Sequence, residues 1–141
     1  MIVASSQAQP LNVIGVAVTV LASSAASGGM AFTLQEGPEG CGPPPHCHPW
    51  DEAFFVLEGS VEFVVDGTPT EVAAGTLVHV PGGTVHAFRY GAGGAKVFEV
   101  TSPGSRAAEM FADFDAEMPD GEINPAKVVD IFDRHGIRLM A

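Results

Sequence analysis

Basic side chains are scarce in this chain of 141 residues: 6 Lys and Arg stand against 17 Asp and Glu, which gives a net charge of −11. The first basic residue along the chain is Arg89. Binding to a nucleic-acid backbone or to an anionic membrane surface needs clustered basic side chains, and a strongly negative field repels both. We therefore expect neither nucleic acid nor a membrane as a partner.

Long apolar runs and cysteines are also few. The apolar run 13–21 is shorter than the about 20 residues that span a bilayer, and no basic segment precedes it as in a secretory signal. Only two cysteines occur, Cys41 and Cys47, too few for a dense disulfide framework, and we interpret both as free thiols. These features predict a cytoplasmic protein.

The composition indicates one folded, mainly β domain. Hydrophobic residues make up 46% of the chain and charged residues 16%, so a real core can form. The 17 Gly and 11 Pro favour many short strands joined by turns over long helices. Strands are predicted at 11–21, 30–35, 53–57, 61–65, 70–72, 77–80, 85–90 and 96–101.

The last third of the sequence has helical spacing instead. Helices are predicted at 106–118 and 125–135, the second with Asn124 as its cap, Pro125 in its first turn and Gly136 just after its end. We expect a flexible arm at 1–10, a β-barrel at 11–104 and a helical extension at 105–141 that packs on the outside of the barrel or over one end.

Histidine and glutamate form the most informative cluster. His46, His48 and Glu52 lie within seven residues, and His86 follows on a later predicted strand. On an extended segment His46 and His48 point to the same face, because side chains alternate. Imidazole suits Zn, Cu, Fe and Ni, and a carboxylate adds Mn, so these residues are a plausible set of ligands for one divalent metal ion. Two unrelated surface histidines are the alternative.

The surrounding spacing strengthens the metal hypothesis. From Gly40 to Gly59 the sequence reads Gly-x5-His-x-His-x3-Glu-x6-Gly, and after 15 further residues Gly75 begins Gly-x5-Pro-x-Gly-x2-His. This pair of patterns resembles the two motifs of the cupin superfamily and departs from them only at Tyr90, where the family usually has Asn. Ser102 to Gly104 and the helices that follow are similar to small bacterial cupins related to quercetin dioxygenases.

The resemblance implies a double-stranded β-helix, the jelly-roll cupin barrel, which is often a homodimer. It implies one divalent transition metal ion held by His46, His48, Glu52 and His86, without distinguishing Fe, Mn, Ni, Cu and Zn. Strand parity from these ligands predicts four pocket residues, which are Phe54, Val56, Phe88 and Tyr90. Such a pocket favours an apolar or aromatic small molecule with a metal-binding oxygen group.

The function hypotheses follow from this site. The first is a mononuclear metal enzyme of the dioxygenase type, an oxidoreductase acting on a small aromatic or enolic molecule, with Glu52 as the catalytic base. The second is a non-redox Zn or Ni enzyme, an isomerase, cyclase or lyase, in which the metal polarises a carbonyl. The third is a small-molecule-binding protein without catalysis.

Overall fold

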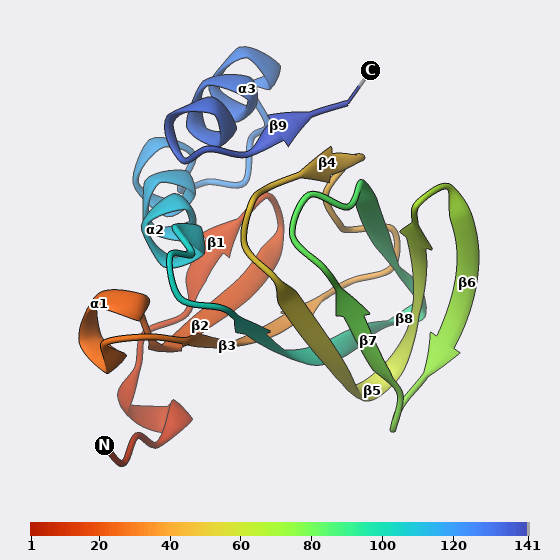
Figure 1. The fold of residues 1–141 in the computed structure, drawn as a ribbon, viewed down its shortest axis with the longest axis horizontal. Coiled ribbons are helices and arrows are strands. Elements are labelled where there is room, and N and C mark those ends of the chain that lie inside the picture. The colour runs from red at the N-terminus through yellow and green to blue at the C-terminus, as the bar shows by residue number, and fades with distance from the viewer. Residues whose placement is uncertain (141) are drawn as a thin grey trace.

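The structure, a computed structural model, describes residues 1–140, so the last position of the expected extension, Ala141, lies outside the described residues. The strands curl into a barrel, and two helices of the C-terminal segment lie together at one side of it (Figure 1). The predicted mainly β jelly roll with two C-terminal helices is confirmed. Within residues 1–140, no helix is both long and apolar enough to cross a membrane.

The elements follow one another along the chain in the order that the sequence pattern suggests. The strands are β1 (Leu11–Val13), β2 (Val16–Ala22), β3 (Ala31–Gly37), β4 (His46–Cys47), β5 (Glu52–Val65), β6 (Thr68–Ala73), β7 (Leu77–Val80), β8 (His86–Thr101) and β9 (Arg138–Leu139). The helices are a 3-10 turn (Ser5–Gln7), α1 (Ser24–Ser27), α2 (Ala107–Glu117) and α3 (Pro125–Arg134).

Two long bent strands, β5 and β8, organise the barrel. Residues 52–59 of β5 pair with residues 95–101 of β8, and residues 61–65 pair with 86–90, all antiparallel. The register shifts on both sides of the bend near Gly59, as β-bulges do. Gly59 has φ +77°, and a Cβ there would lie 2.2 Å from the carbonyl oxygen of Gly94. Only glycine fits this corner, which gives the motif glycine a structural reason.

The structure corrects several predicted boundaries. The run 11–21 is divided into β1 and β2 by a turn at Ile14 and Gly15, both with positive φ. The strands predicted at 53–57 and 61–65 are one strand, β5, and those at 85–90 and 96–101 are one strand, β8. Both strands bend but stay hydrogen-bonded to each other on either side of the bend, so no loop separates the two halves of either strand. The sequence pattern also missed the two-residue strands β4 and β9.

The C-terminal helices bury one apolar face each. Asn124 caps α3 by accepting hydrogen bonds from the backbone N–H groups of Ala126 and Lys127, as predicted. The buried side chains of the two helices are Ala107, Met110, Phe111, Phe114, Val128, Ile131 and Phe132. They share one core cluster with the inward side chains of the barrel. The helices therefore cover the end of the barrel at which β4 lies.

Candidate functional site

Three histidines meet inside the barrel at the end covered by the helices. His46 on β4 is the register partner of His86 on β8, and His48 follows β4 directly. One nitrogen of each ring lies within 4.8 Å of those of the other two. All three side chains are buried, with His86 only 1% exposed. The structure thus brings together the histidines that the sequence pattern singled out.

The backbone determines that Nδ1 of each ring carries a proton. The Nδ1 atoms of His46, His48 and His86 lie 2.8, 3.0 and 2.9 Å from the carbonyl oxygens of Pro44, Trp50 and Thr84. Because a carbonyl oxygen can only accept, each Nδ1 carries a proton and donates it. The Nε2 atoms then remain for a common centre, and such a backbone hydrogen bond is the usual support of a metal-binding histidine.

Glu52 completes the cluster from the start of β5. Its Oε2 lies 2.7 Å from Nε2 of His48, and its Oε1 lies 3.3 Å from Nε2 of His86. Burial raises the pKa of the Glu52 carboxyl, but the hydrogen bonds from the two histidines outweigh it and lower the pKa to about 2. A buried carboxylate among three imidazoles requires positive charge, either protons or a cation. The donor set therefore fits a divalent transition metal ion.

The pKa values of two of the histidines are shifted in opposite directions. Burial, followed by the neighbouring His86, lowers the pKa of His46 to about 4, so this ring is neutral at physiological pH. Burial also acts to lower the pKa of His86, but the hydrogen bond and charge of Glu52 raise it overall. A neutral imidazole is the form that binds a metal, so His46 needs no deprotonation to act as a ligand.

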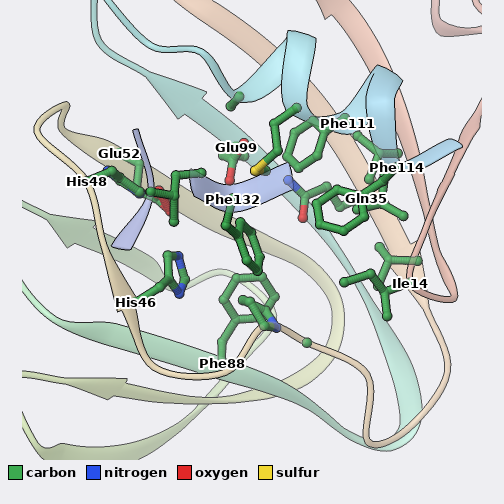
Figure 2. A pocket seen from close by; sticks show the side chains of 18 of the residues that line it. Ile14, Gln35, His46, His48, Glu52, Phe88, Glu99, Phe111, Phe114 and Phe132 are labelled. Carbon is green, nitrogen blue, oxygen red and sulfur yellow. The ribbon is translucent and has the colours of Figure 1, made fainter. Parts of the chain in front are cut away.

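A cavity of about 80 Å³ adjoins the histidines. His46, His48 and Glu52 form one part of its wall, and aromatic side chains of α2 and α3 close it from the other side (Figure 2). The wall is mostly apolar, but it also contains Gln35 and Glu99. Ligand pockets commonly measure about 300–1,000 Å³, so this cavity suits a compact molecule.

The lining differs from the pocket predicted by parity. Phe88 lines the cavity, whereas Phe54, Val56 and Tyr90 are not among the surrounding residues. These three side chains do point into the barrel, as parity requires, and each is at most 1% exposed. They lie where the barrel is filled: the ring of Phe54 packs 5.2 Å from that of Phe88. Of the four predicted pocket residues, Phe88 thus borders this cavity, and the other three lie deeper in the barrel interior.

Several site residues were missed by the sequence reasoning. Trp50 stacks on His48 with ring centroids 4.4 Å apart, and Phe132 of α3 lies nearly parallel to His46 at 6.1 Å. Parity alone could have found Trp50, because it shares the alternation of His48 and Glu52. Phe132 is distant in sequence, and only the packing of α3 brings it here.

The remaining sequence candidates lie apart from the cluster. His79 on β7 is exposed and lies outside the histidine cluster. Both cysteines are free thiols: Cys41 is half-buried, and Cys47 is buried on β4 between the two histidines, with its Sγ 4.0 Å from a guanidinium nitrogen of Arg138. Neither thiol belongs to the group of potential metal ligands in the described part of the chain.

Comparison with known proteins identifies the family. The pattern of the family described as "Cupin domain" matches residues 33–101, which hold all four candidate ligands. The comparison with curated proteins found no match. The chain belongs to the cupin superfamily.

Solved structures share the barrel. KdgF from Halomonas sp. has a TM-score of 0.69 at 17% identity, over 77% of this chain and 97% of that one. A predicted oxalate decarboxylase from Thermotoga maritima has 0.65 at 24%, over 73% and 99%. The polyketide cyclase RemF from Streptomyces resistomycificus has 0.62 at 26%, over 73% and 78%. The chain is thus a cupin whose buried histidine triad could hold a metal ion, among structural neighbours of varied function.

Proposed function

We propose that this protein is a mononuclear metal-dependent cupin enzyme of the dioxygenase type, acting on a small aromatic or enolic molecule. The observation that carries the proposal is the set of three buried histidines whose Nδ1 atoms are all held by backbone carbonyls, so that their Nε2 atoms face one centre beside an apolar cavity. A purely structural histidine cluster would not need three rings oriented in the same way.

The residues of the chain have distinct parts in this proposal. His46, His48 and His86 would hold the metal, with Glu52 as a fourth ligand. When bound, the metal would supply a Lewis acid and, if it is iron, manganese, nickel or copper, a redox centre. Glu52 also faces the cavity and can take a proton from an enol or hydroxyl group of the substrate at one carboxylate oxygen. The aromatic side chains of α2 and α3 exclude water from that step.

A non-redox reaction is the second candidate, an isomerase, cyclase or lyase. It is favoured by the similarity to the structure of a polyketide cyclase and to that of a predicted oxalate decarboxylase. An oxygen electrode separates the two candidates when small enolic and aromatic molecules are screened against iron-, nickel- and zinc-loaded protein. Oxygen uptake with iron or nickel supports a dioxygenase, and conversion without uptake supports the non-redox reaction.

Metal content tests the site itself. The purified protein should hold about one transition metal ion per chain, and the double variant His46→Ala/His86→Ala should hold none, because two remaining ligands cannot keep a divalent ion against water. His79→Ala, which removes an exposed histidine on β7, is the matched control and should keep its metal. Unchanged metal in the double variant would refute the site.

We also expect a homodimer, which light scattering of the same samples measures.

A further inference from the structure

A row of buried polar side chains lies next to the histidine cluster, and two of its three members, Gln35 and Glu99, line the cavity. Thr33 and Gln35 point inward from β3, and Glu99, the register partner of Thr33, points inward from β8. Figure 2 shows Glu99 along the wall between Glu52 and Gln35. The proposed chemistry does not use these groups, and apolar side chains at the same positions would be less costly to bury.

The hydrogen bonds in this row run in one direction, toward Glu99. Nε2 of Gln35 donates to Oγ1 of Thr33 over 3.2 Å, and Oγ1 of Thr33 donates to Oε1 of Glu99 over 3.3 Å. Oε1 is therefore occupied as an acceptor. Within residues 1–140 the carboxyl group of Glu99 donates no hydrogen bond to the protein. If Oε2 carries a proton, that O–H group remains free for a molecule in the cavity.

The surroundings of Glu99 favour the uncharged form. Its side chain is buried, and no Lys, Arg or His in the described residues forms an ion pair with it. Burial, followed by the charge of Glu52, raises the pKa of Glu99 well above its usual value, and the polar neighbours Gln35 and Thr33 offset this only in part. The surroundings thus shift the pKa values of two carboxyl groups in one cavity in opposite directions, that of Glu52 down and that of Glu99 up, a pattern typical of sites that bind and transform small molecules.

We propose that Glu99 is a second polar anchor of the cavity, an uncharged carboxylic acid that donates a hydrogen bond to an oxygen atom of the bound molecule while another part of that molecule faces the three histidines. The substrate class is then a compact molecule with two oxygen functions, one that binds the metal and one that accepts a hydrogen bond. This inference rests on the proposed metal-dependent function. It makes Glu99 a determinant of substrate specificity.

Two probes of equal length test the anchor on zinc-loaded protein by calorimetry. Pentanehydroxamate and 3-methoxypropanehydroxamate share a metal-binding hydroxamate and differ only in one CH₂ group, which an ether oxygen replaces in the second. An ether oxygen accepts a hydrogen bond but cannot donate one. In the wild type the ether probe should bind at least as tightly as the alkyl probe. In Glu99→Leu the ratio of the two affinities should shift about 3- to 10-fold toward the alkyl probe, because the ether oxygen loses its donor.

Two further variants make the result specific. Glu99→Gln keeps an N–H donor of similar size and should keep the wild-type ratio, and Glu36→Leu, an exposed change on β3, should leave it unchanged. An equal ratio in the wild type and Glu99→Leu overturns the anchor and leaves the metal site standing. Failure of both hydroxamates to bind any zinc-loaded form counts against the proposed function, and the anchor falls with it.

Infrared spectroscopy tests the protonation of Glu99 without metal or ligand. The metal-free wild type at pH 7 should show the C=O stretching band of a protonated carboxylic acid, and Glu99→Gln should lack it. The band should persist in Glu62→Gln, which removes an exposed carboxylate of β5. If the difference spectrum between the wild type and Glu99→Gln contains only a carboxylate band, Glu99 is ionised and the proposal is refuted.

Discussion

Replacing Phe132 by Ala tests whether the C-terminal extension is part of the metal site. The ring is 4% exposed on α3, packs against Phe114 of α2 at 5.3 Å and lies nearly parallel to His46, with an interplanar angle of 10°. Removing a buried phenylalanine ring usually costs about 3–5 kcal/mol of unfolding free energy. One side of this ring borders the cavity of about 80 Å³ and makes fewer contacts there. We therefore expect the lower end, about 3 kcal/mol.

The assay is urea unfolding of the metal-free protein, followed by circular dichroism. For a chain of this length the loss corresponds to a decrease in melting temperature of about 10 °C. A second measurement is zinc affinity, which should fall about 10-fold. Phe132 restricts the orientation of the His46 ring, and removing a group that orients a metal ligand typically weakens metal binding by this amount or more.

The control is Val129→Ala on the same helix. Val129 is 54% exposed, so its truncation should change the unfolding free energy by less than about 0.5 kcal/mol. An average substitution changes the free energy of unfolding by about 1 kcal/mol. If Phe132→Ala lowers it by no more than this, α3 is a passive tail. Unchanged zinc affinity with reduced stability would show that α3 supports the fold and not the ligands.

Three other perturbations give separate readouts. In the metal-free protein, the free energy of unfolding should decrease by about 3 kcal/mol as the pH falls from 6.5 to about 4, because His46 takes up a proton more readily in the unfolded chain than in the fold. In urea titrations, His46→Gln should abolish this part of the decrease. Glu52→Gln should keep the metal with reduced affinity while turnover falls about 100- to 10,000-fold, and near-normal turnover would make Glu52 a dispensable ligand. Gly59→Ala should destabilise the protein by about 2–4 kcal/mol, since its Cβ would meet the backbone of Gly94, and Gly67→Ala, at a similar φ but without a near neighbour, by only about 1–2 kcal/mol in the same unfolding assay.

The spacing of residues within short segments predicted the histidine cluster and the strand faces. His46 and His48 share a face because side chains alternate, and the same rule correctly turned Phe54, Val56, Phe88 and Tyr90 into the barrel. The cap of α3 was also predictable, because Asn124 and Pro125 act within one turn of the helix. Such features depend on neighbours along the chain, so the sequence by itself contains them.

Other features were decided by the tertiary structure, because they depend on groups far apart in the sequence. Parity showed which side chains point inward, but only the packed barrel showed that Phe54 fills the core and that the cavity lies beside Phe88. Strand β9 pairs with β4, which places Leu139 beside His46. The uncharged state proposed for Glu99 likewise comes from its burial opposite Thr33 and near Glu52, a combination of three strands that no local pattern in the sequence specifies.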